Sequence, residues 1–83
     1  MVNEVFPHAS LMDHARTTAQ KIVAKAPIAI AYSKRVIERG YDAGLGVGNE
    51  LEATAFSTLF DTEDMREGTK AFVEKRSPQF QGR

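Results

Sequence analysis

Few side chains in this sequence have the types and spacing that enzyme chemistry requires, and a group of carboxylates is the most notable. Glu63 and Glu67 are four residues apart, so on a helix they share one face, and Asp64 lies beside them. Such a pair could act as general acid and base if burial shifted the pKa values. Acidic side chains also stabilise the first turn of a helix through its dipole. Helix-terminus electrostatics is the simpler interpretation, and the acid–base pair is the alternative.

The sequence offers neither a metal-ligand set nor an activated nucleophile. His8 and His14 are the only histidines, they are six residues apart, and the chain has no cysteine. Zinc sites on helices use a closer histidine spacing or thiolate ligands. No serine or threonine has a histidine placed in a recognisable motif. We therefore expect no metal and no covalent catalysis.

An aromatic and cationic group near the C-terminus suggests a ligand contact. Phe72 and Lys75 are three residues apart, so they share a helix face, and Phe56 lies on the preceding apolar segment. A ring beside an ammonium group suits the base and phosphate of a nucleotide. The alternative is that the rings are core residues and the lysine is simply solvated. The glycine-rich stretch 44–48 lacks the spacing of a phosphate-binding loop and is predicted to be a flexible connection.

Four predicted helices with short connections would position these side chains, so the fold class is all-α. Helical spacing of apolar residues, capping residues and the placement of prolines define the boundaries. The first helix runs from about Ser10, its N-cap, to Lys25, and the second starts at Pro27 with Gly40 near its end. The third runs from about Gly48 to Phe60. The fourth follows a cap at Asp61 or Thr62 and ends at Lys75 and Arg76, before Pro78.

The predicted helices carry more apolar surface than so small a core can bury. The second helix has one stripe formed by Ile30, Lys34, Ile37 and Tyr41. The third has a broad apolar face formed by Leu51, Ala55, Phe56, Leu59 and Phe60, and the fourth has an inner stripe formed by Met65, Thr69, Phe72 and Val73. Surplus apolar surface indicates a partner. Association is also the remaining way to stabilise a small chain without cysteine.

The composition further restricts the classes of partner that we expect. The 83 residues include 11 basic and 11 acidic side chains, so the formal net charge is zero and nothing recruits nucleic acid or an anionic membrane. No apolar run approaches the roughly 20 residues of a transmembrane helix, and no export signal is visible at the N-terminus. We expect a cytoplasmic chain without nucleic-acid, membrane or metal partners. Its basic stretch 16–39 and acidic stretch 42–67 suit packing within a subunit or between copies.

Several segments, in order along nearly the whole chain, are similar to one family. Residues 2–7 (VNEVFP) resemble a strand end in the enoyl-CoA hydratase/isomerase, or crotonase, family, and residues 21–27 (KIVAKAP) resemble a helix junction there, followed by Lys34. The most specific match is the stretch 60–76 (FDTEDMREGTKAFVEKR), which Pro78, Phe80 and Gly82 continue. The chain is thereby identified as resembling the C-terminal helical segment of that family.

The resemblance implies a noncatalytic module. Residues 1–83 would be the C-terminal helical domain, with 1–8 a remnant of the hand-over from the core and 9–83 the helices. The oxyanion hole and the catalytic carboxylates of the family would be absent, so the chain alone is expected to be inactive and to bind no cofactor. Coenzyme A thioester is implied for the parent enzyme, whose reaction would be hydration of enoyl-CoA in fatty-acid metabolism. Phe56, Phe72 and Lys75 resemble family positions that contact the CoA moiety.

Three functional hypotheses follow. The first is an oligomerisation and CoA-pocket-covering module that self-associates or docks onto a crotonase core, with the stretch 44–48 as a hinge for exchange between copies. The second is an unrelated helical protein-interaction domain. The third is an autonomous acyl-CoA enzyme that uses Glu63 and Glu67 as its acid–base pair.

Overall fold

A computed structural model describes residues 2–83, and Met1, which the predicted remnant 1–8 includes, lies outside the described residues. Within residues 2–83 the chain forms four helices and no strand. They are α1 (His8–Val23), α2 (Pro27–Ala43), α3 (Leu45–Leu59) and α4 (Glu63–Glu74). The prediction of an all-α chain of four helices with short connections is confirmed.

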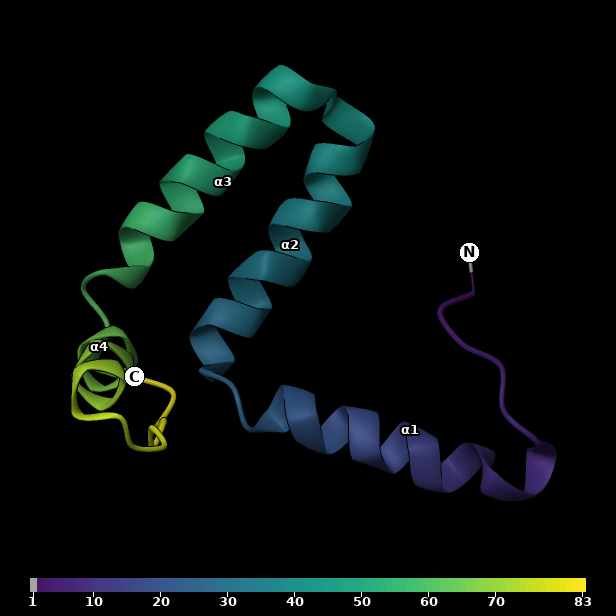
Figure 1. The fold of residues 1–83 in the computed structure, drawn as a ribbon. Coiled ribbons are helices and arrows are strands. Elements are labelled where there is room, and N and C mark those ends of the chain that lie inside the picture. Colours follow the sequence, from purple (N-terminus) through teal and green to yellow (C-terminus); the bar gives the residue numbers. More distant parts are fainter. Residues whose placement is uncertain (1) are drawn as a thin grey trace.

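The centre of the molecule is the antiparallel pair α2 and α3, which meet at one sharp turn and run back beside each other (Figure 1). Gly40 of α2 and Gly48 of α3 allow the closest approach, since a Cβ atom added to Gly40 would lie 3.3 Å from the Gly48 Cα. Farther from the turn, Val36 of α2 and Leu51 of α3 are half-buried and Ala55 is buried. This small apolar seam is the main helix–helix contact among the described residues.

The two outer helices differ in how they are held. α1 extends away from the α2–α3 pair and buries none of its residues (Figure 1). Its one aromatic contact is local, because the Phe6 ring stacks on His14 with centroids 3.8 Å apart. α4 lies beside the ends of α2 and α3 that are farthest from their turn (Figure 1). It buries Asp64 and Ala71.

Local sequence signals predicted one helix cap correctly and another wrongly. Thr62, one of the two predicted caps of the fourth helix, is confirmed, because its Oγ1 accepts a hydrogen bond from the Met65 N–H at 3.1 Å. Ser10 as the cap of the first helix is wrong. α1 starts at His8, the Pro7 carbonyl accepts the Ser10 N–H at 3.0 Å, and the Ser10 hydroxyl donates to that same carbonyl. The N-cap is Pro7, three residues before the predicted cap, and no side chain caps the helix there.

The predicted flexible connection at 44–48 is also wrong. Only Gly44 turns the chain, with a φ of 81° that favours glycine, and α3 begins at Leu45. Gly46 and Gly48 lie inside α3, and the Gly48 N–H donates to the Gly44 carbonyl at 3.0 Å. The backbone of Gly40 passes next to Gly48. The packing of the two helices, and not a loop, therefore requires a glycine at this position.

The apolar faces predicted for α3 and α4 pack inward only in part, and the stripe predicted for α2 does not. On α3, Leu51, Ala55 and Leu59 face inward as expected, whereas Phe56 and Phe60 are more than half exposed. On α2 the inner face is rotated from the predicted stripe and consists of Tyr32, Val36 and Gly40, leaving Ile37 and Tyr41 exposed. On α4 the face with Asp64, Gly68 and Ala71 packs inward. Of the predicted stripe Met65 is half-buried, whereas Phe72 and Val73 are exposed.

The resulting shape leaves much more surface exposed than a compact domain would. The radius of gyration is 15.9 Å, against about 12 Å for a compact domain of this length. The accessible surface is 7197 Å², against about 4,900 Å² for a folded monomer of this mass. Ala55 and Ala71 are the only apolar residues buried in the described part of the chain. None of the described helices is long and apolar enough to cross a membrane.

Candidate functional site at the C-terminal end of α4

The end of α4 has an unusual backbone conformation. Lys75 follows the last helical residue with φ 54° and ψ 39°, in the left-handed region. The Arg76 N–H donates to the Ala71 carbonyl at 3.0 Å and the Lys75 N–H to the Phe72 carbonyl at 3.3 Å. Many helices end with this pair of hydrogen bonds, which run from the two residues after the helix to carbonyls five and three residues earlier. Glycine usually occupies the left-handed position. Here a lysine occupies that position.

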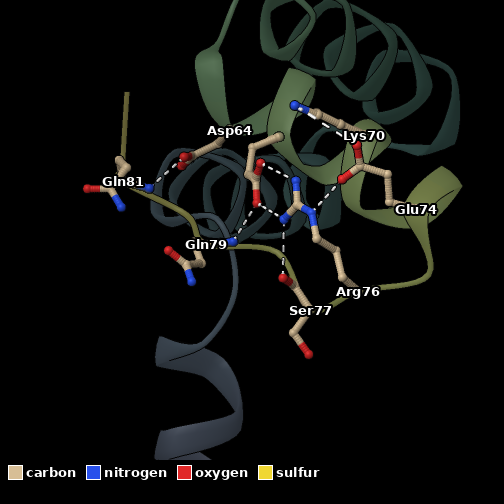
Figure 2. A network of polar contacts seen from close by, with 8 residues as sticks. Asp64, Lys70, Glu74, Arg76, Ser77, Gln79 and Gln81 are labelled. Atoms are coloured by element: carbon tan, nitrogen blue, oxygen red, sulfur yellow. Dashed lines mark hydrogen bonds and ion pairs between the residues drawn. The ribbon is translucent and has the colours of Figure 1, made fainter.

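Arg76 folds back along α4 and forms a double ion pair with Glu67 (Figure 2). Its two terminal nitrogens donate to the two Glu67 carboxylate oxygens at 2.6 and 2.9 Å, and its Nε donates to Glu74 at 2.6 Å. The Gln79 N–H donates to Glu67 at 2.8 Å. The Arg76 hydrogen bonds, followed by that of the Gln79 N–H, lower the pKa of Glu67 from 4.5 to about 2. Glu67 is therefore a fixed anion at neutral pH.

Asp64 holds the last residues of the chain. Its two carboxylate oxygens accept the backbone N–H groups of Gln81 at 2.6 Å and Gly82 at 2.9 Å, and its own N–H donates to the Arg83 carbonyl at 3.0 Å. The carboxylate is almost completely buried. Phe80 packs its ring 3.4 Å from where a Cβ atom of Gly68 would lie. We call Asp64 and Glu67, together with the segment 76–83 that they hold, the C-terminal clasp.

The clasp separates the two glutamates of the proposed acid–base pair. Glu63 forms an ion pair with Arg83 at 2.8 Å, whereas Glu67 binds Arg76. Each carboxylate has its own arginine, and the lowered pKa of Glu67 makes it a poor proton carrier near neutral pH. Residues 2–83 contain no group of three potential metal ligands. The geometry therefore favours a structural role for these acids.

The three residues predicted to contact CoA do not form one cluster. Phe72 is 85% exposed and lines an apolar hollow of about 380 Å³ together with Ile28, Leu59 and Phe80. Lys75 follows at the same end of α4 and is exposed. Phe56 lies on α3 and lines a separate hollow of about 250 Å³, with Leu59 as a shared wall. The structure brings Phe72 and Lys75 to the same helix end and places Phe56 apart from them.

Sequence reasoning did not find the clasp. The acidic residues of the fourth helix and Arg76 after it are evident in the sequence, but the residues that pair across the clasp are 9 to 18 positions apart. Most of the contacts to the tail use backbone N–H groups, which no side-chain pattern reveals. The spacing of Glu67 and Arg76 predicts an ion pair only if the chain is known to reverse direction at Lys75.

Comparison with other proteins identifies the relatives of this chain. The sequence pattern of the enoyl-CoA hydratase/isomerase family matches residues 1–83. The chain is 40% identical over 76 residues to the short-chain-enoyl-CoA hydratase of Clostridium acetobutylicum, covering 92% of this chain and 29% of that protein. It is 34% identical over 83 residues to the 2,3-dehydroadipyl-CoA hydratase of Escherichia coli, covering all of this chain and 32% of that protein.

Solved structures agree with the sequence matches. The enoyl-CoA hydratase of Bacillus anthracis superposes with a TM-score of 0.90 at 35% identity, over 95% of this chain and 31% of that one. The corresponding protein of Geobacillus kaustophilus gives a TM-score of 0.91 at 36% identity, over 99% and 31%. The chain thus spans about a third of the length of the relatives that it matches. It belongs to the enoyl-CoA hydratase/isomerase family.

Proposed function

We propose that this chain is the C-terminal helical segment of an enoyl-CoA hydratase/isomerase and serves assembly and covering of the CoA pocket. The observation that carries the proposal is the large exposed surface of a chain that belongs to this family. The excess over a compact monomer of this mass is about 2,300 Å². One side of a standard protein interface buries only about 800 Å². The exposed surface of the helices is therefore large enough to form an interface with the rest of a family fold or with a second copy of the chain.

Exposed apolar residues occur on all four helices, Ile37 and Tyr41 of α2 among them, which supports covering by a large partner. α1 exposes Leu11 and Ile22, α3 exposes Phe56, and α4 exposes Phe72 and Val73. Removing such side chains from water is the main driving force of association. Family membership also removes the alternative of an unrelated interaction domain. An autonomous acyl-CoA enzyme has no geometric support, since the glutamates it would need are held by separate arginines.

For the complete enzyme we propose hydration of an enoyl-CoA thioester in fatty-acid metabolism, in the cytoplasm. Two relatives named above, the short-chain-enoyl-CoA hydratase and the 2,3-dehydroadipyl-CoA hydratase, motivate the reaction class. Phe72 would provide an apolar surface for the CoA moiety and the Lys75 ammonium would meet a phosphate. Phe56, which lines another hollow, would contact a different part of the same ligand. Coenzyme A belongs to the complete enzyme as substrate and is not a resident cofactor of this chain.

A segment exchange tests this proposal. The matching 76-residue segment of the Clostridium acetobutylicum enzyme is replaced by this chain, and hydration of a short-chain enoyl-CoA thioester is measured. We expect an assembled, active chimera. The same chimera with Phe72→Ala should show a raised KM with kcat nearly unchanged, because only ligand binding is affected. A chimera that assembles but has no hydratase activity would contradict the proposal.

A further inference from the structure

We infer that Glu67 is a positioning residue: by holding Arg76 it fixes the left-handed turn at Lys75 and so directs the Lys75 ammonium toward a phosphate of the CoA thioester. The turn and its control by Glu67 stand on the geometry alone. The identity of the anion rests on the proposed function.

The first step is that the ion pair requires the turn. If α4 continued through residue 76, Glu67 and Arg76 would be separated by about 13 Å along the axis and by about half a turn around it. In the structure the Arg76 guanidinium instead binds both oxygens of Glu67, at 2.6 and 2.9 Å. Such two-point contacts between guanidinium and carboxylate are strong and geometrically specific. The pair therefore forms only when the chain reverses at Lys75.

The second step is that the same contacts fix the outgoing chain. The Gln79 N–H donates to the Glu67 Oε1 at 2.8 Å, beside the Arg76 contact (Figure 2). Residues on both sides of the reversal are thus bound to one carboxylate. A lysine in the left-handed region is less favourable than glycine, and the two contacts offset that cost. Strain of this kind is typical of functional sites.

The third step concerns which cation is free to bind an anion. Three cations lie near the end of α4. Lys70 is 4.0 Å from Glu74, and Arg76 is bound to Glu67 and Glu74. Lys75 has no acidic partner within ion-pair distance among residues 2–83. The clasp neutralises Arg76 and leaves Lys75 as the available positive charge at the same helix end as Phe72.

Nuclear magnetic resonance of the isotope-labelled chain tests the turn directly. The carbon chemical shifts of Lys75 report its backbone conformation, and we expect the left-handed values in the unmodified chain. Glu67→Gln should move them toward averaged values. Glu74→Gln is the matched control, because it removes the other acid that contacts Arg76 while leaving the Glu67 and Gln79 contacts intact, and it should leave Lys75 unchanged. Arg76→Lys, which keeps the charge but loses the two-point contact, should act like Glu67→Gln and provides a second variant should the first fail to fold.

Titration with coenzyme A of the chimera described above, in which this chain completes the Clostridium acetobutylicum enzyme, tests the direction of the ammonium. We expect Glu67→Gln to weaken binding about threefold. In a Lys75→Gln background the same substitution should have no further effect, because no ammonium remains to be positioned. A general loss of stability would instead weaken binding in both backgrounds, and that result would overturn the positioning role.

The outcomes separate the inference from the proposed function. A chain that has the left-handed turn and loses it in Glu67→Gln, together with a chimera that binds no coenzyme A, would contradict the phosphate contact and leave the control of the turn standing. A Glu67→Gln chain that keeps the left-handed turn would overturn the inference whether or not coenzyme A binds.

Discussion

Arg76 and Glu67 are nine residues apart in the sequence, yet the guanidinium of one binds both carboxylate oxygens of the other at 2.6 and 2.9 Å. This contact joins the middle of α4 to the segment that leaves the helix. With the Asp64 contacts to Gln81 and Gly82, it gives the C-terminal quarter of the chain its own polar framework. α1 has no comparable support, because it buries none of its residues.

The Glu67–Arg76 pair should make stability depend on pH in the acid range. The pKa of Glu67 is lowered from 4.5 to about 2 in the folded chain, so its stabilising effect is present above pH 4.5 and is lost as the pH falls toward 2. Thermal unfolding followed by circular dichroism should show a midpoint that decreases over this range. Glu67→Gln should show a weaker decrease, and an equally steep one would contradict the role of the pair.

Replacing Lys75 by glycine should stabilise the chain. Glycine adopts the left-handed conformation without the Cβ penalty, so Lys75→Gly should raise the free energy of unfolding by about 1 kcal/mol. Lys70→Gly is the control, since position 70 lies inside α4 and glycine there should cost about 1 kcal/mol. Urea denaturation measures both. Loss of stability in Lys75→Gly would show that the lysine side chain itself supports the fold.

Asp64 should be the acid whose removal costs most. Asp64→Ala removes the buried carboxylate that accepts the N–H groups of Gln81 and Gly82 in partly buried hydrogen bonds, which should cost about 2 kcal/mol. Hydrogen exchange of those two amides should accelerate. Glu63→Ala removes only an exposed ion pair with Arg83 and should cost under about 1 kcal/mol. Unchanged exchange at both amides in Asp64→Ala would contradict the clasp.

Alanine substitutions at two glycines of the α2–α3 pair should change the free energy of unfolding in opposite directions. Gly40→Ala places a Cβ atom 3.3 Å from the Gly48 Cα, so the two helices must separate, and we expect a loss of about 1 kcal/mol or more. Gly46→Ala meets no atom within 4 Å and should stabilise α3 by roughly 0.5–1 kcal/mol. Chemical denaturation distinguishes them. A stabilising Gly40→Ala would mean that the close approach of the helices is not as described.

Local signals in the sequence predicted the number and approximate bounds of the helices. Pro27 starts α2 and Thr62 caps α4 as expected, because both act through the backbone of their own helix. The glycine-rich stretch misled the prediction, since glycine is enriched both in loops and at close helix crossings. Only the contact between Gly40 and Gly48 distinguishes the two cases.

The inner faces and the clasp were harder to predict for a related reason. Helical spacing identifies apolar stripes but not which stripe packs within this chain, so Phe72 and Val73 were expected inside and are exposed. The clasp depends on a left-handed lysine, a conformation that sequence reasoning assigns to glycine. Without that turn, nothing indicates that Arg76 can reach Glu67.

Sedimentation equilibrium of the purified chain over a wide range of concentration, with and without coenzyme A, tests the central claim most directly. The exposed apolar residues of α1, α3 and α4 should drive copies together, so we predict a discrete oligomer whose population rises with concentration. A monomer at every concentration would contradict the claim, because it would show that the helices need no partner to cover these faces.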